Sequence, residues 1–274
     1  MERIAVIGLG IIGGSICAAL TKAGYVVDGT DLNEKSIAFA VEKGYIQAKA
    51  EDIAQYDTVF LAIPPNATVA ALENMNFKDG AIVADICGVK LCVEQAVYAQ
   101  SRNYSYVGLH PMAGKETSGI ASASASLFVM ANLIITVADK TELGAIEKIK
   151  AYAKAMRFGR IIECTAAEHD RKIALTSQLP HIVSNAFVKS AQVKNCEGFT
   201  GGSFQDMTRI AGVDEKIWTQ LYMSNREYAL EELQGLIKNL EKYRVALENK
   251  DADALAEALK EGRLIRENIK RGKN

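Results

Sequence analysis

The sequence predicts an α/β protein with a mostly parallel sheet, followed by an all-helical part. Over the first 164 residues, short runs rich in β-branched and aromatic residues alternate with helical patterns, which is typical of βαβ units. After Cys164 the strand patterns stop. The length of 274 residues allows two domains at roughly 100–200 residues each. We therefore expect one domain over residues 1–164 and a helical domain over residues 165–274.

Short apolar runs define the predicted strands of the first part. The third run ends before Pro64 and Pro65, because proline cannot continue a ladder. Crossovers between parallel strands should be right-handed. The predicted strands are 3–8, 25–31, 58–63, 81–85, 104–109, 132–138 and 160–164. The predicted helices between them are 12–23, 34–43, 89–101 and 142–156.

The second part begins with a capping-box spacing, in which Thr165 is the N-cap and Glu168 lies three residues later. This spacing predicts a helix through about residue 191, interrupted near Pro180. A glycine-rich loop follows at 198–203, and helices are predicted at 214–249 and 251–271. A helix of about 36 residues is about 54 Å long. We expect part of it to pack against a second copy, which predicts a homodimer.

Composition and charge exclude several classes of protein. The chain is 49% hydrophobic and 24% charged, with a net charge of −1, so we expect no extended nucleic-acid-binding surface. The apolar runs are shorter than the ~20 residues of a membrane span, and the N-terminus enters a strand pattern rather than a signal peptide. The five cysteines are scattered without a C-x-x-C pair, so we expect neither disulfides nor a metal site. We also expect a cytoplasmic location.

A glycine-rich motif follows the first predicted strand and begins the first predicted helix. The first glycine of such a motif permits a tight turn, the second lets a pyrophosphate approach the backbone, and the third lets the helix pack close to the strand. Backbone N–H groups at the start of the helix then face the phosphates. We therefore predict a dinucleotide-binding site. Its residues are Gly8, Leu9, Gly10, Ile11, Ile12 and Gly13.

An acidic residue, Asp31, ends the second predicted strand. A carboxylate in this place accepts hydrogen bonds from the adenosine ribose hydroxyls and repels a 2′-phosphate. Leu32 and Asn33 follow, so no arginine stands there to neutralise such a phosphate. The sequence therefore favours NAD over NADP as the cofactor. The structural alternative is that the glycines form only a turn and that Asp31 only caps the next helix.

Three histidines occur in the chain, and His110 directly follows a predicted strand. Ligands of open α/β sheets bind outside the carboxyl ends of the strands, so His110 is placed to act as a general base near neutral pH. The alternative is a histidine that fixes the turn before Pro111. His169 lies in the first turn of a predicted helix, and we expect it near solvent with a structural role.

Further polar candidates lie in the helical part. Gln178 and His181 are three residues apart around Pro180, so they can share one face of a kinked helix and contact a polar substrate. Arg209 can bind a carboxylate in a bidentate manner, and Asp206 can pair with it or with another basic group. For both pairs the alternative is a purely structural polar contact.

Five tracts together resemble the prephenate/arogenate dehydrogenase family of tyrosine biosynthesis. The Gly-x-His-Pro-Met-Ala-Gly and Thr-Arg-Ile-Ala tracts are the specific ones, whereas many dehydrogenases share the nucleotide motif. The resemblance extends from residue 3 to the final helices. The five tracts are residues 6–15, 108–114, 167–170, 179–181 and 206–211.

The resemblance implies a Rossmann-type domain, a helical dimerisation domain and an active site between them. It implies the monofunctional form, with NAD as cofactor and a small-molecule substrate. The reaction would be the oxidative decarboxylation of prephenate to 4-hydroxyphenylpyruvate, or of arogenate to tyrosine. His110 would accept the proton of the ring hydroxyl as the hydride leaves. The implied substrate-binding residues are His181, Arg209, Gln178, Lys115, Glu116 and Asp206.

Two positions depart from the family pattern. Gly88 stands where many members have a serine whose hydroxyl contacts the ring hydroxyl, and Gln178 stands where many have a histidine. These departures keep a non-catalytic NAD-binding homologue open as an alternative. A second alternative is a β-hydroxyacid dehydrogenase with a catalytic lysine in the helical part, where Lys172 and Lys189 occur without a supporting motif.

Overall fold

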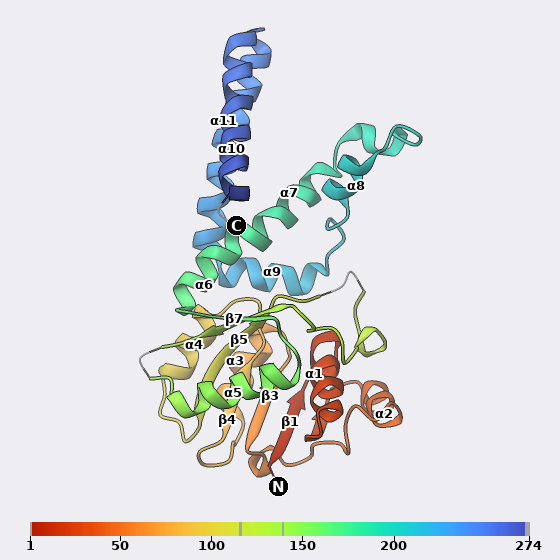
Figure 1. The fold of residues 1–274 in the computed structure, drawn as a ribbon, viewed down its shortest axis with the longest axis vertical. Helices are drawn as coiled ribbons and strands as arrows, with labels where there is room; N and C mark the ends of the chain where they lie inside the picture. The colour runs from red at the N-terminus through yellow and green to blue at the C-terminus, as the bar shows by residue number, and fades with distance from the viewer. Residues whose placement is uncertain (1, 115–116, 139, 272–274) are drawn as a thin grey trace. The chain divides into compact units, whose positions relative to one another are not determined.

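The computed structural model describes residues 2–114, 117–138 and 140–271 (Figure 1). Over these residues seven strands form one sheet in the order β2-β1-β3-β4-β5-β6-β7. All neighbouring strands are parallel except β5 and β6, which are antiparallel. The predicted mostly parallel α/β sheet is confirmed. The strands are β1 (Arg3–Ile7), β2 (Val26–Thr30), β3 (Thr58–Leu61), β4 (Ile82–Asp85), β5 (Ser105–Pro111), β6 (Asn132–Thr136) and β7 (Arg160–Cys164).

Helices connect the strands of the sheet. Helix α3 is an element that the sequence pattern does not predict, and it begins at Pro65, whose missing N–H costs nothing at the first helical position. β3 ends at Leu61, two residues before the predicted end at Ile63 and three before Pro64. The helices are α1 (Ile11–Lys22), α2 (Glu34–Glu42), α3 (Pro65–Asn74), α4 (Leu91–Tyr98) and α5 (Leu143–Ala155).

The strand order indicates where a ligand binds the sheet. β1 lies between β2 and β3, so the chain reverses its direction of winding there, and ligands of such sheets bind outside the carboxyl ends of the strands at this point. Gly8 follows β1, Asp31 follows β2, and Gly88 comes three residues after β4. His110 is the second-last residue of β5, which runs parallel to β4. The sheet therefore brings these four positions to one edge.

A kinked helical segment follows the sheet. The Thr165 hydroxyl accepts a hydrogen bond from the Glu168 backbone N–H at 3.1 Å, so the predicted N-cap is confirmed. The interruption near Pro180 is a π-helical turn, in which the Leu179 N–H donates to the Ala174 carbonyl five residues back. The elements are α6 (Ala166–Ile173), the π-turn (Ala174–Gln178), α7 (Leu179–Phe187), α8 (Gly202–Thr208) and α9 (Glu215–Ser224).

The expectation of one continuous helix over 214–249 is wrong. The chain breaks at Asn225, which has φ −121° and ψ 28°, so α9 ends at Ser224 and α10 begins at Arg226. The Asn225 amide donates hydrogen bonds to the Asp170 carbonyl at 2.9 Å and to Gln178 Oε1 at 2.8 Å. These buried bonds stabilise the break, and the helix-length argument for a dimer no longer holds.

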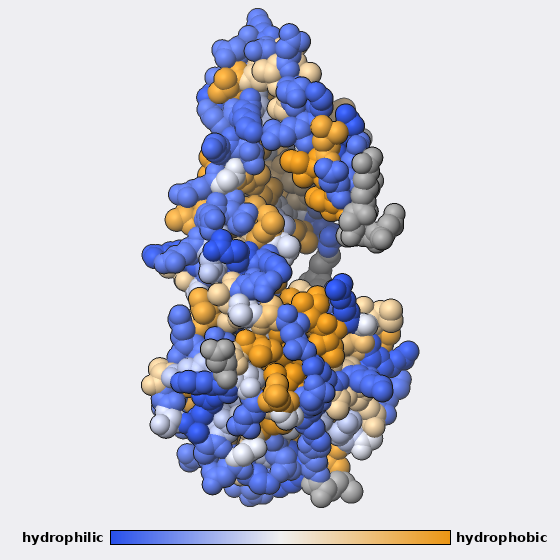
Figure 2. Space-filling model, turned by 60° about the vertical axis from the view of Figure 1, so that its left-hand side comes forward, coloured by the Kyte–Doolittle hydropathy of each residue, from blue (hydrophilic) through white to orange (hydrophobic). Residues whose placement is uncertain are grey.

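The described chain forms two compact units, divided between Asn225 and Arg226. The first contains the sheet and the helices up to α9. The second is a helical hairpin of α10 (Arg226–Glu248) and α11 (Ala252–Arg271), which confirms the predicted final helix. Figure 2 shows apolar residues interspersed among hydrophilic ones on the molecular surface. Large apolar residues are exposed on this hairpin, namely Leu230, Ile237, Leu240, Val245, Leu247, Leu259, Leu264, Ile265 and Ile269.

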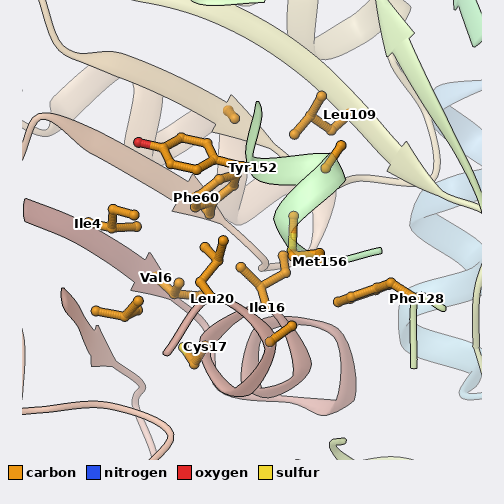
Figure 3. Close-up of a cluster of buried hydrophobic side chains, with 14 of the residues drawn as sticks. Ile4, Val6, Ile16, Cys17, Leu20, Phe60, Leu109, Phe128, Tyr152 and Met156 are labelled. Atoms are coloured by element: carbon orange, nitrogen blue, oxygen red, sulfur yellow. The ribbon is translucent and has the colours of Figure 1, made fainter. Parts of the chain in front are cut away.

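The core of the first unit packs α1 and α5 against the sheet (Figure 3). Ile16 and Leu20 of α1 meet Phe60 of β3 and Tyr152 of α5 in one buried cluster. The Tyr152 and Phe60 rings lie edge to face, with their centroids 5.8 Å apart. This packing holds α1, and with it the glycine loop at its start, against the sheet. Among the described helices, none is both long enough and apolar enough to cross a membrane.

Candidate active site

The glycine loop between β1 and α1 is built for close backbone approach. Gly8 has φ +94°, and a Cβ there would lie 2.4 Å from the Ala62 carbonyl oxygen. A Cβ on Gly13 would lie 1.8 Å from the Gly8 carbonyl oxygen, so the helix could not approach the strand with any larger residue. At Gly10 a Cβ would meet no atom within 4 Å. The loop therefore has an open cradle at Gly10, where a phosphate group fits against the helix N-terminus.

Asp31 holds this loop in place. Its Oδ2 accepts a hydrogen bond from the Leu9 N–H at 2.6 Å, and its Oδ1 accepts one from the Asn33 N–H at 2.8 Å. The cap of α2 is Asn33, whose side chain accepts from the Lys35 N–H. Asp31 is thus not the helix cap of the structural alternative. Each carboxylate oxygen has a further lone pair, so it can also accept from a ribose hydroxyl.

His110 begins a chain of hydrogen bonds that runs through His169 to Asp170 on α6. Its Nδ1 lies 2.8 Å from His169 Nε2, and His169 Nδ1 lies 2.7 Å from Asp170 Oδ1. His169 and Asp170 are both only 1% exposed. The expectation that His169 lies near solvent is therefore wrong, because the helix turns this residue toward the sheet.

The chain of hydrogen bonds selects one tautomer for each histidine. An ionised Asp170 only accepts hydrogen bonds, so His169 carries its proton on Nδ1 and offers the Nε2 lone pair. His110 must then donate from Nδ1, which leaves its own Nε2 as an acceptor. The three residues thus orient His110 as a base, in the way that a buried aspartate orients a catalytic histidine in hydrolases.

Burial, together with the proximity of His169 and of the Lys90 ammonium, holds the pKa of His110 well below its usual value. Burial also lowers the pKa of His169, although the hydrogen bond to Asp170 opposes this shift. Both imidazoles are therefore neutral at pH 7. A neutral His110 can accept a proton, which a general base requires.

The start of α4 anchors Asp170. The Lys90 N–H donates to Asp170 Oδ1 at 2.8 Å, and the Leu91 N–H donates to Oδ2 at 2.9 Å. The Lys90 ammonium is fully buried and pairs with Asp85 Oδ1. Asp85 Oδ2 also accepts from the Tyr106 hydroxyl at 2.6 Å. The base is thus held by buried groups of β4, α4 and α6.

Gly88 lies beside the His110 ring. A Cβ on Gly88 would lie 3.8 Å from His110 Cε1 and 3.9 Å from Nε2, and 3.4 Å from Leu221 Cδ2 of α9. These are ordinary contact distances. The glycine leaves space of about one heavy atom next to the nitrogen that accepts the proton.

A cavity of about 440 Å³ lies between the loop after β5 and the helical segment. His181 and Arg209 both line it, so the structure brings together two of the predicted substrate-binding residues. Its lining residues are Gly114, Thr117, Ser118, His181, Arg209, Ile210, Gly212, Val213, Asp214 and Trp218.

The orientation of His181 is set by a backbone carbonyl. His181 Nδ1 lies 2.8 Å from the Ile210 oxygen, so Nδ1 carries the proton and Nε2 is the second polar atom of the ring. The ring packs on Trp218 of α9, with centroids 4.0 Å apart. Burial lowers the pKa of His181, and the charge of Arg209 adds to this effect.

The other predicted substrate-binding residues are placed differently. Gln178 is 2% exposed, and both ends of its amide bond protein groups, which favours the structural alternative for this residue. Asp206 is exposed on α8, one turn before Arg209, and is not among the lining residues of the cavity. Lys115 and Glu116 lie outside the described residues.

The sequence reasoning missed His169, Asp170 and Trp218 as parts of the site. A signal for the first two was present in α6, whose buried residues are Ala166, His169, Asp170 and Ile173. These positions form the inward stripe of an amphipathic helix. A histidine and an aspartate at such positions indicate a buried polar function rather than a solvent-facing one.

Comparisons with known proteins agree over almost the whole chain. Residues 16–162 match the nucleotide-binding domain model of prephenate dehydrogenase, and residues 165–261 match its dimerization domain model. A prephenate dehydrogenase of Lactococcus lactis is 30% identical, with 97% of this chain and 77% of that protein covered. A cyclohexadienyl dehydrogenase of Zymomonas mobilis is 30% identical, with 97% and 95% covered.

A solved structure shows the same architecture. It is the prephenate dehydrogenase of A. aeolicus in complex with hydroxyphenyl propionate and NAD⁺, with a TM-score of 0.85 and 27% sequence identity. The alignment covers 98% of each chain.

Proposed function

The chain belongs to the prephenate dehydrogenase family, and we propose that it catalyses the NAD-dependent oxidative decarboxylation of prephenate to 4-hydroxyphenylpyruvate, a step of tyrosine biosynthesis. One observation carries the proposal most directly. The bonds His110–His169–Asp170 leave a neutral imidazole nitrogen as a proton acceptor at the sheet edge that also holds the glycine loop.

NAD is the cofactor, and it fits the residues present. The cradle at Gly10 and the backbone N–H groups at the start of α1 would hold its pyrophosphate. Asp31 would accept from the adenosine ribose hydroxyls. When bound, NAD supplies the hydride acceptor for the ring carbon that carries the hydroxyl.

His110 performs the proton transfer. Its Nε2 accepts the proton of the ring hydroxyl as the C–H bond gives up its electron pair and the carbonyl forms. The positive charge that develops on His110 is stabilised through His169 by the Asp170 carboxylate. The ring carboxylate then leaves as carbon dioxide, and its bonding electrons pass through the ring, which becomes aromatic, to the carbonyl oxygen. That oxygen takes up a proton, which protonated His110 can return, to give the phenol. The chain therefore needs to align the substrate and hold one proton.

The substrate is a dianion, and the cavity supplies positive and hydrogen-bonding groups for it. The Arg209 guanidinium can bind a carboxylate with two parallel hydrogen bonds. His181, oriented by the Ile210 carbonyl, presents Nε2 as a second polar contact. By family resemblance, we propose that Lys115 and Glu116 belong to the substrate network, and that Asp206 acts on it from outside the cavity lining.

Arogenate is the alternative substrate, since a relative of 30% identity is a cyclohexadienyl dehydrogenase. Purified protein is mixed with NAD⁺ and either prephenate or arogenate, and NADH absorbance is followed. Turnover of prephenate at a higher kcat/KM supports the proposal, and a preference for arogenate replaces it with the alternative. NAD binding without turnover of either substrate would favour the non-catalytic homologue. With the preferred substrate, His110→Asn should lower turnover by roughly 10²–10⁴-fold while NAD affinity is kept.

The exposed apolar residues of α10 and α11 support a homodimer, in which a second copy covers them. We propose a domain boundary at residue 164, which the gap between the two matched family domains supports, whereas the compact units of the fold divide at residue 225. We place the enzyme in the cytoplasm. A monomeric mass by light scattering at micromolar concentration would refute the dimer.

A further inference from the structure

Gln178 stands at a junction of three elements. It is the last residue of the π-turn, 2% exposed, and its side chain faces the end of α9. Its Nε2 donates to the Leu221 carbonyl at 3.1 Å, and its Oε1 accepts from Asn225 Nδ2 at 2.8 Å. Asn225 Nδ2 also donates to the Asp170 carbonyl at 2.9 Å. One amide therefore joins the π-turn to α9, and a second joins both to α6.

Only one orientation of the Gln178 amide satisfies these partners. A flipped amide would point its N–H groups at the Asn225 donor and its oxygen at the Leu221 carbonyl. The Tyr222 hydroxyl adds a further bond of 3.2 Å to the Gln178 backbone carbonyl. Buried bonds of this kind are costly to leave unmade, so they keep α9 in a single position on the π-turn.

The residues of α9 that this junction holds are walls of the site. The Leu221 Cδ2 lies 3.4 Å from the place that a Cβ on Gly88 would take, and the His110 ring lies 3.8 Å from the same place. Trp218, one turn earlier, packs on His181 and lines the cavity. A shift of α9 would move both walls at once.

We propose that Gln178 is a positioning residue, whose amide clamps α9 to the π-turn and so fixes Leu221 beside His110 and Trp218 beside His181. The inference rests on the proposed function for its kinetic readout. It differs from the predicted substrate contact, because Leu221 and Asn225 engage both the N–H and the oxygen of the amide. A neutral amide suits this role, since it offers a donor and an acceptor together at every pH.

The substitution Gln178→Glu tests the clamp. A protonated glutamic acid can donate to the Leu221 carbonyl and accept from Asn225, as glutamine does, whereas a carboxylate can only accept and would face the carbonyl. Burial raises the pKa of a carboxyl group, so the introduced side chain should change from its protonated form to a carboxylate within an accessible pH range. We expect kcat/KM for the cyclohexadienyl substrate to be at least tenfold below wild type at pH 9 and within about threefold at pH 6.

At each pH, kcat/KM of the variant is divided by kcat/KM of wild type, which removes the effects of the native titrating groups. Those groups are His169 and Asp170 on α6, His181 on α7 and Tyr222 on α9, which both proteins share. The matched control is Gln47→Glu, an exposed glutamine, for which the ratio should stay flat. The loss at pH 9 should lie in the KM of the substrate, with the KM of NAD unchanged. Circular dichroism at each pH confirms that the variant is folded.

A flat ratio between pH 6 and pH 9 in folded Gln178→Glu would overturn the proposal. If that variant unfolds at pH 9, Gln178→Met carries the test. It should raise the substrate KM at every pH, and an unchanged substrate KM would refute the clamp. Trp218 is the single tryptophan of the chain, so its fluorescence gives a readout that does not need turnover. A pH-dependent emission shift in Gln178→Glu, larger than that of wild type, supports the clamp even if neither prephenate nor arogenate is oxidised. A lack of oxidation would refute only the proposed function.

Discussion

The hydrogen bond between His110 and His169 can be tested with two substitutions of His169, to asparagine and to glutamine, whose side chains place the amide group at different distances from the backbone. His169 Nε2 accepts from His110, and His169 Nδ1 donates to Asp170. An asparagine at 169 can retain the donor near Nδ1 but offers no acceptor near Nε2. A glutamine reaches the position of Nε2 with its oxygen and can still accept from His110. Both variant side chains are uncharged, so a difference in activity between them reports on the orientation of His110 and not on a change of charge.

The magnitude follows from the buried N–H that His169→Asn leaves without an acceptor. An unsatisfied buried donor costs about 1–3 kcal/mol, which is about 5- to 160-fold at 1.36 kcal/mol per tenfold. The cost appears in turnover, because His110 is no longer held with Nε2 toward the substrate. We therefore expect kcat to fall about 5- to 160-fold in His169→Asn, and less than about fivefold in His169→Gln.

The assay is steady-state NADH formation with the preferred substrate at saturating NAD⁺, with thermal unfolding measured for both variants. NAD affinity should be unchanged, since the glycine loop lies between β1 and α1, whereas this pair lies on β5 and α6. Equal kcat values for the two variants, or wild-type kcat in His169→Asn, would refute the argument that His169 orients the base.

Four further predictions follow from the site. First, the acid limb of the pH profile of kcat/KM should lie below pH 6.5, because the pKa of His110 is depressed. A limb above pH 6.5 would contradict the burial argument. Because His110 and His169 are neutral in the folded protein, unfolding takes up protons, so thermal stability should fall as the pH drops below about 6.5. Second, Asp31→Ala removes the bonds to Leu9 and Asn33 and should raise the KM of NAD about tenfold while narrowing its advantage over NADP; an unchanged NAD/NADP ratio would argue against its ribose role. Third, Gly88→Ser should fold and keep kcat within about threefold, since its Cβ makes ordinary contacts, whereas the larger Gly88→Leu should lose turnover by steric conflict with Leu221 and His110; an active Gly88→Leu would show that the space is larger than the contacts indicate. Fourth, Arg209→Ala should raise the substrate KM about 10- to 100-fold with little change in kcat, and a loss confined to kcat would place Arg209 outside substrate binding.

Local patterns in the sequence were sufficient for the sheet and for the cofactor loop. Strand alternation depends on neighbouring residues, so β1 to β7 could be predicted within a few positions of their observed bounds. The glycine loop was also predictable, because its requirements are local: a positive φ at Gly8 and no Cβ at Gly13. His110 could be placed at the carboxyl end of the sheet, because its position near the end of a strand is readable from the sequence.

Tertiary structure decided which polar groups meet the base. The bond between His110 and His169 joins residues 59 positions apart, and the bond between Gln178 and Asn225 joins residues 47 apart. No local pattern encodes such pairings, and the prediction of an unbroken helix through residue 225 was wrong for this reason. The stripe of buried residues in α6 could have indicated that His169 faces inward, but not which group it meets. Burial then determines the roles of these residues. Removing water makes an unpaired polar group costly, so each buried group must find its partner across the fold, and those partners determine which nitrogen of His110 faces the substrate.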